Sequence, residues 1–425
     1  LDALALVPDS AAFLVDAGLA EATKGDKKRS IYRRTAVMDA LGRLDDEAAR
    51  GKLSDALRAP EPFMRILAIE NLAGRGPDVI ALVEPLMDDP VPAVRRAAFD
   101  AVRERAPDFP AWIEVLLRRY EKTRGVDRVR LIAALEALSG LRVGDDAEVW
   151  STWYEGVKAA VEDGTFERPK PEGEDDPKEG DEGEDAAEAA EDDGDEASEP
   201  ELPEVEARVS FYGVRSPSVD LILLVDGSRM MDLPASLEVQ TKRANSWWRQ
   251  TGPKWKESEM DHHAFLLQQL AWTMEALPEG AHFGVVHLQG STPNRLGVMG
   301  GKKLLRPSKG ARKSVLKTVR KSRPEGLLSC QEGLAQALRM CGGEDCRNPK
   351  PDAVLADTVY LVSTGTNGGR YPLPEILRAW WKRANRFHRL TVHAIRICDE
   401  KEEAETLMKG LAADSVGTYL WLTEL

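Results

Sequence analysis

The carboxyl-terminal half of the chain alternates short apolar runs with stretches whose apolar residues follow a helical spacing. The apolar runs are too short for helices and fit buried strands. They occur at 221–225, 283–288, 358–362, 391–397 and 418–422, and the helical stretches at 263–277, 309–322, 331–341, 374–386 and 402–412. This alternation predicts a doubly wound, Rossmann-like α/β fold with a mostly parallel sheet covered on both faces.

The amino-terminal part has a different pattern, in which an arginine precedes small and apolar residues at helical spacing. Arg33, Arg65, Arg95 and Arg130 are separated by 32, 30 and 35 residues. A period of this size is typical of a stacked two-helix unit, in which small residues let neighbouring helices approach closely. Residues 31–140 therefore predict an all-α solenoid, with an ordinary helical bundle as the alternative.

Between these parts lies an acidic segment with almost no large apolar residue. Residues 167–206 hold 20 Asp and Glu against 3 Lys and Arg, a net charge of −17, whereas the whole chain carries −14. Such a segment cannot bury enough surface to offset the entropy of ordering, so a disordered linker is expected. The chain is therefore multidomain, with a helical domain at 1–166, a linker at 167–206 and an α/β domain at 207–425.

The first strand of the α/β domain ends in a polar sequence that begins with Asp226-Gly227-Ser228 and reaches Met230. Ligands of open α/β sheets bind at the carboxyl ends of the strands. The sequence resembles the Asp-x-Ser-x-Ser motif of von Willebrand factor type A (VWA) domains, which helps to hold Mg²⁺ or Mn²⁺. Asp226 and Ser228 match the motif, but Met230 replaces its second serine. A thioether is a poor ligand for a hard cation, which prefers oxygen.

Two further loops of the VWA metal site also depart from the family pattern. Leu328 stands where the family has a threonine, and Thr364 in Ser363-Thr364-Gly365 stands where it has an aspartate. The resemblance therefore implies a degenerate site, with at most a weak or vestigial Mg²⁺ or Mn²⁺ at Asp226 and Ser228 and no other cofactor. The alternative is that these two residues only form the turn.

The resemblance to VWA domains extends over residues 207–425. Residues from 30 to about 160 are similar to short bacterial HEAT repeats. The combination of short HEAT repeats, an acidic linker and a carboxyl-terminal VWA domain is similar to bacterial proteins of a planctomycete-like kind. The family functions that this implies are those of protein–protein recognition.

Two segments of the α/β domain are candidates for partner contact. An insertion at about 230–261 contains Trp247, Trp248 and Trp255 among basic residues, a composition found at interfaces but also compatible with packing over the domain. The second segment, 302–323, holds ten Lys and Arg and no acid. This segment predicts an amphipathic helix with a basic face. That face is either solvated, bound to a partner or attracted to the acidic linker. Its candidate residues are Lys302, Lys303, Arg312, Lys313 and Arg320.

Other chemistry is sparse in the sequence. His262 and His263 are adjacent, so they point to different faces of a helix and are expected to be exposed to solvent. Cys341 and Cys346 are close enough for a disulfide, with two free thiols as the alternative. The chain begins at Leu1 rather than Met, which fits a removed signal peptide and favours a secreted or periplasmic location over the cytoplasm. No apolar run approaches the ~18 residues of a membrane-spanning helix.

These features favour a non-enzymatic scaffold that binds other proteins through its two domains. Ser228 lacks the Gly-x-Ser-x-Gly surroundings of a hydrolase nucleophile, and the sequence has no Walker-type phosphate loop, so no enzyme activity is expected. One alternative is a metal-dependent adhesion module that binds a partner's carboxylate through a weak Mg²⁺ site. A more remote alternative is binding of an anionic polymer or nucleic acid by the basic 302–323 segment.

Overall fold

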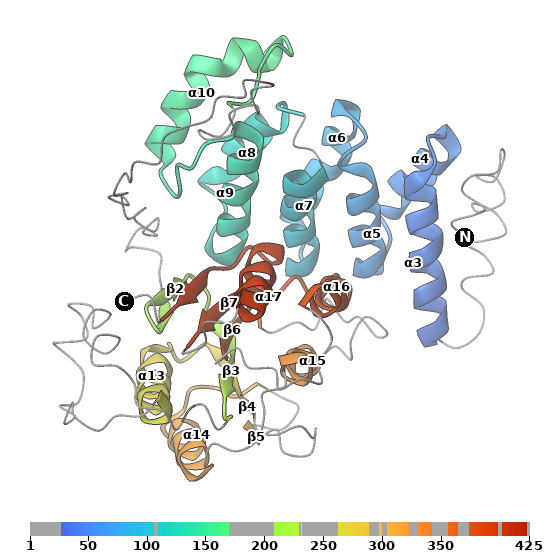
Figure 1. The fold of residues 1–425 in the computed structure, drawn as a ribbon. Helices are drawn as coiled ribbons and strands as arrows, with labels where there is room; N and C mark the ends of the chain where they lie inside the picture. The colour runs from blue at the N-terminus through green and yellow to red at the C-terminus, as the bar shows by residue number, and fades with distance from the viewer. Residues whose placement is uncertain are drawn as a thin grey trace, which may run out of the picture.

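The chain folds into an amino-terminal helical region and a carboxyl-terminal α/β region (Figure 1). The structure, a computed structural model, describes residues 27–105, 109–169, 208–228, 231, 262–288, 297–299, 304–322, 330–341, 356–363, 374–397 and 402–422. Most of the expected linker lies outside these ranges. Within them, no helix combines the length and apolar character needed to cross a membrane.

The helical region is a row of helices in which α3, α5, α7 and α9 lie side by side (Figure 1). Its helices are α3 (Lys27–Arg43), α4 (Glu47–Ala56), α5 (Pro62–Leu72), α6 (Ile80–Val83), α7 (Pro92–Arg105), α8 (Trp112–Tyr120), α9 (Gly125–Ser139) and α10 (Ala147–Glu162), with 3₁₀ turns η3 (Pro77–Val79) and η4 (Glu84–Asp88). Local residues set their ends. The Asp46 side chain caps α4, and Gly140 ends α9 in a left-handed conformation.

The α/β region contains a six-stranded sheet in the order β5-β4-β3-β6-β7-β8. The strands are β3 (Asp220–Asp226), β4 (His282–Leu288), β5 (Gly297–Met299), β6 (Thr358–Ser363), β7 (Thr391–Arg396) and β8 (Tyr419–Trp421). The β4–β5 pair is antiparallel and the other pairs are parallel. A separate hairpin of β1 (Val209–Phe211) and β2 (Val214–Ser216) precedes the sheet.

Helices cover both faces of the sheet. One core contains Leu221, Leu223 and Val225 of β3, together with α13 (His262–Ala276) and α14 (Lys309–Lys321). The opposite core contains Ile222 and Leu224 with α15 (Cys330–Met340), α16 (Pro374–Asn385) and α17 (Glu402–Asp414). Successive residues of a strand point to opposite faces, so the continuous apolar run of β3 is explained by burial on both sides.

The predicted α/β fold class is confirmed, and all five predicted strands and five predicted helices are present in nearly the expected ranges. The β1–β2 hairpin and the short edge strand β5 were not predicted as strands. Cys341 is a buried free thiol, as the alternative to a disulfide requires, and Cys346 lies outside the described residues.

The two regions meet at the turn between α16 and β7, which inserts into the row of helices. The Asn385 side chain closes this turn, accepting from Leu390 N at 2.8 Å and donating to Leu390 O at 2.9 Å. Arg389 adopts the uncommon left-handed conformation, with φ of 54°. Phe387 is buried in the core of the helical region, where its ring packs edge-on against Phe63 at 6.2 Å between centroids.

Six residues of opposite charge alternate across this contact and are named here the ion-pair chain. It runs Asp39, Arg386, Glu70, Arg389, Asp100, Arg130. The three acids come from α3, α5 and α7 at spacings of 31 and 30 residues. Helices that are neighbours in the row therefore present an acid at equivalent positions. The two arginines of the turn lie between these acids, and Arg130 of α9 is the last member of the ion-pair chain.

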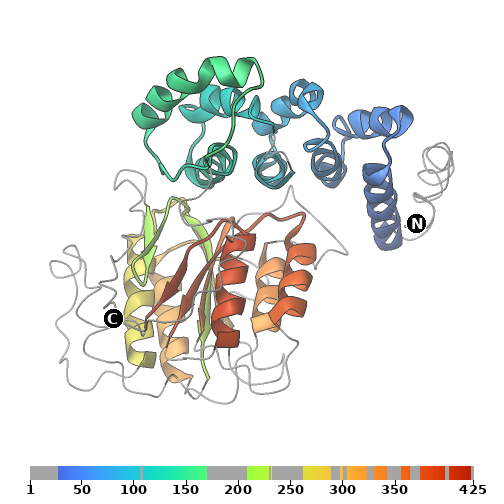
Figure 2. The same cartoon turned by 45° about the horizontal axis from the view of Figure 1, so that its top comes forward.

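The row of helices covers the amino-terminal edge of the sheet (Figure 2). Arg130 donates to the Thr391 hydroxyl at 3.1 Å, at the start of β7, and Arg96 lies 3.5 Å from the Asp357 carboxylate, just before β6. Parallel strands place their carboxyl ends at one edge, so the end of β3 at Asp226 lies about 20 Å from the covered edge. The helical region therefore leaves the carboxyl edge of the sheet uncovered.

Candidate functional site

The carboxyl edge of the sheet has a topological switch point between β3 and β6. The chain leaves β3 toward β4 on one side, and β6 toward β7 on the other. The crevice formed at such a reversal is where open α/β sheets bind ligands. Asp226 ends β3 and Ser363 ends β6, so the predicted Asp226 and the serine of the Ser363-Thr364-Gly365 loop are brought to this crevice.

A tight turn fixes the Asp226 carboxylate at the strand end. Asp226 and Ser228 are buried, and Ser228 N donates to Asp226 Oδ1 at 2.7 Å. Gly227 N donates to Leu288 O at 2.8 Å, which attaches the turn to β4. A Cβ atom on Gly227 would lie 2.4 Å from the His287 ring, so the turn requires glycine here. The turn-forming role considered for Asp226 and Ser228 is thus present.

A buried thiol, Cys330, lies beside this carboxylate and was not predicted as part of the site. Burial, followed by the negative charge of Asp226, raises the pKa of the Cys330 thiol to about 12, although its contact with Ser363 lowers that pKa. The thiol is therefore protonated at neutral pH. Its position at the first residue of α15, directly after the second loop of the resembled motif, was the available signal in the sequence.

Two histidines pack near the same turn. The rings of His263 on α13 and His287 on β4 have centroids 6.1 Å apart. Burial, together with the neighbouring His263, lowers the pKa of His287 to about 4, so its ring is neutral at physiological pH. The expectation that His262 and His263 are exposed is wrong, because both are buried where the first turn of α13 packs onto the sheet.

The remaining predicted residues divide into two groups. Arg312 on α14 donates to Leu277 O at 3.0 Å, while Lys313 and Arg320 are exposed on the same helix. Val315 and Val319 are buried, which confirms the predicted amphipathic helix. Outside the described residues lie the degenerate motif positions, the insertion tryptophans and two lysines: Met230, Leu328, Thr364, Trp247, Trp248, Trp255, Lys302 and Lys303.

The donor set at the crevice is limited. Asp226 is the carboxylate at this strand end, and one of its oxygens already accepts the Ser228 amide. Mg²⁺ requires oxygen ligands in near-octahedral geometry and gives up its water reluctantly. Across the described part of the chain, no cluster of three or more His, Cys, Asp or Glu side chains is arranged to hold a metal ion. The described residues therefore do not fit a tightly held Mg²⁺.

Comparisons with known proteins found matches among solved structures. No protein-family model matches the chain, and no curated protein matches its sequence. One of the solved structures that match is a von Willebrand factor type A protein from Catenulispora acidiphila, at 20% identity and a TM-score of 0.32. The match covers 49% of this chain and 39% of the other. This chain thus spans well under two thirds of the length of that protein.

Proposed function

We propose that this protein is a non-enzymatic scaffold for protein–protein interaction, built from a HEAT-like solenoid and a VWA domain. The observation that carries the proposal is the buried Asp226 at the switch point of the sheet. This edge lies opposite the one that the helical region covers, so a partner can approach it while the two regions remain docked.

The sheet order supports the VWA assignment. With the strands renumbered from β3, the order is 3-2-1-4-5-6, with an antiparallel strand at one edge. The helical region supports the HEAT-like assignment through its repeated acids, Asp39, Glu70 and Asp100, at spacings of 31 and 30 residues. Repeated helical units of this size form extended surfaces that suit elongated partners.

A second candidate function is metal-dependent adhesion, which the buried Asp226 beside Ser228 and Ser363 favours. In this case a partner's carboxylate would complete the coordination of a weakly held cation. Asp226 and Ser228 would be its ligands from this chain, and the cation would supply the positive charge that attracts the partner. Because the described donors do not fit tight binding, occupancy would depend on the partner.

The test uses the full-length protein as bait with native lysate, followed by reconstitution with each purified captured protein. Wild type is compared with Asp226→Ala and with the matched control Asp220→Ala, at the opposite end of β3. A scaffold that uses the carboxyl edge binds a purified partner in EDTA, and Asp226→Ala weakens binding more than Asp220→Ala. Loss of binding in EDTA supports metal-dependent adhesion. No direct binding by any captured protein refutes both functions.

A further inference from the structure

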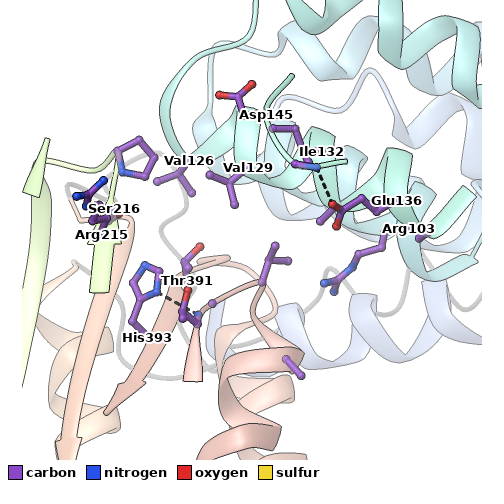
Figure 3. A pocket seen from close by; sticks show the side chains of 18 of the residues that line it. Arg103, Val126, Val129, Ile132, Glu136, Asp145, Arg215, Ser216, Thr391 and His393 are labelled. Carbon is purple, nitrogen blue, oxygen red and sulfur yellow. Dashed lines mark hydrogen bonds between the residues drawn. The ribbon is translucent and has the colours of Figure 1, made fainter. Parts of the chain in front are cut away.

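A cavity of about 530 Å³ lies between the helical region and the α/β region, at the edge of the sheet opposite Asp226 (Figure 3). Its walls come from α9 and the loop that follows it, from the end of β2, from the start of β7 and from the turn between α17 and β8. Small-molecule sites commonly have volumes of ~300–1,000 Å³ and occur preferentially between domains.

One wall of the cavity is apolar. Val126, Val129 and Ile132 of α9 line it along the helical side (Figure 3), and Val416 of the α/β region also lines the cavity. Val416 has φ of 57°, a left-handed conformation that is a rare outlier for a β-branched residue. Strained backbone of this kind is concentrated at binding sites. The apolar wall suits the hydrocarbon body of a ligand.

The polar groups of the cavity favour an anion. Arg103 lies toward one end and Arg215 toward the other (Figure 3), and Arg142 also lines the cavity. Both lining acids already accept hydrogen bonds: Asp145 from Tyr120 Oη at 2.6 Å and Arg128 Nε at 2.5 Å, and Glu136 from Gly144 N at 3.2 Å.

Arg103 donates to Glu104 at 2.7 Å through one of its five N–H groups. Its planar guanidinium therefore retains further donors that can bind a carboxylate. Burial lowers the pKa of His393 to about 4, so this lining residue is neutral at physiological pH. Its Nδ1 accepts from Thr418 N at 3.1 Å, which leaves Nε2–H as the hydrogen-bond donor of the ring.

We propose that this cavity binds a small monocarboxylate with an apolar body, held between the two regions. The carboxylate binds at Arg103 and the hydrocarbon lies along Val126, Val129 and Ile132. The ligand contacts both α9 and the start of β7, so its binding energy adds to the attraction between the helical and α/β regions. This site is separate from the strand-end crevice and does not depend on the proposed function.

The test measures binding of decanoate to the full-length protein by isothermal titration, below the micellar concentration. Decylammonium and 1-decanol, which share the hydrocarbon chain, are the charge controls. The expected result is saturable 1:1 binding of decanoate, at least tenfold tighter than binding of either control. Absence of saturable decanoate binding, or equal binding of decylammonium, overturns the proposal.

Variants locate the site. Val129→Trp fills the apolar wall and should weaken decanoate binding at least tenfold, whereas Val149→Trp, at a side chain 47% exposed on α10, should leave it unchanged. Ala133→Leu, a smaller change on the same wall, replaces Val129→Trp if that variant does not fold. Arg103→Gln should weaken decanoate about tenfold and leave 1-decanol unaffected. Decanoate binding that is insensitive to the wall variants places it elsewhere and refutes the assignment.

Discussion

Arg386 Nη2 lies 2.7 Å from Asp39 Oδ1, although the two residues are 347 positions apart in the chain. The same guanidinium reaches Glu70, so one side chain of the α/β region connects α3 with α5. The link between the two regions is thus a specific, largely buried contact as well as a covalent linker.

Removing the buried acid of the ion-pair chain should strongly destabilise the protein. Asp100→Ala leaves the guanidinium of Arg130 buried without its partner, which costs about 3–5 kcal/mol of unfolding free energy. Asp78→Ala is the control, because Asp78 is 58% exposed in its pair with Arg50 and should contribute less than about 1 kcal/mol. Urea unfolding followed by circular dichroism measures both. Equal effects would mean that the ion-pair chain adds nothing beyond a surface salt bridge.

Cleavage of the linker should leave the two halves associated. Phe387 and the ion-pair chain hold the contact independently of residues 170–207. Gel filtration after limited proteolysis should therefore show one peak that contains both fragments. With Arg386→Ala and Arg389→Ala combined, the fragments should separate. Separate peaks for the cleaved wild-type protein would show that the contact requires the covalent link.

Stability should decrease as the pH falls from about 6.5 to about 4. Burial lowers the pKa of His287, His388 and His393 from the usual 6.5 to about 4. In this window the unfolded chain binds protons that the folded chain excludes, so each ring contributes up to about 1.4 kcal/mol of lost stability per pH unit.

The variant His388→Gln removes one of these titrating rings. Its unfolding free energy, measured by urea unfolding at several pH values, should depend less on pH than that of the wild type between 4 and 6.5. His287→Gln should give a similar change in slope. Slopes identical to the wild type in both variants would show that these rings bind protons equally in the folded and unfolded states.

Magnesium affinity should be millimolar or weaker, on the order of −4 kcal/mol. The reason is that, of the five ligand positions of the resembled motif, Asp226 is the one that still holds a carboxylate in this sequence. Isothermal titration of the purified protein tests this prediction. Micromolar affinity that Asp226→Ala abolishes would contradict it.

Restoration of the motif tests the loop alignment separately. The triple variant Met230→Ser, Leu328→Thr and Thr364→Asp supplies two hydroxyls and one more carboxylate. It should bind Mg²⁺ more tightly than the wild type in the same titration. An unchanged affinity would show that these three positions do not face one site.

Much of the α/β fold was predictable because its strands are buried on both faces. The run 221–225 has no polar interruption and ends at Asp226, so both the strand and the polar residue at its carboxyl end could be read from the sequence. The edge strand β5 has only three residues and pairs on one side, which leaves too little pattern to detect.

The contact between the regions could not be predicted in the same way. Arg386 and Arg389 follow a helix end, where exposed arginines are common, and nothing local indicates their distant partners. The burial of His263 was also missed, because it depends on packing against His287 rather than on helical periodicity. The place of Cys330 in the site was missed for a similar reason, because Cys330 begins α15 and its neighbour Ser363 ends β6.

The order of charges in the ion-pair chain restricts how the helical row can change in length. Sliding the α16–β7 turn by one helix toward α9 would place Arg389 beside Arg130, which carries the same charge. The charges therefore favour a single alignment of the turn along the row of helices. A duplicated helical unit placed before α3 would leave this alignment intact, whereas one inserted between α5 and α7 would separate Glu70 from Asp100. The charges therefore tolerate an added unit before α3 and oppose one between α5 and α7.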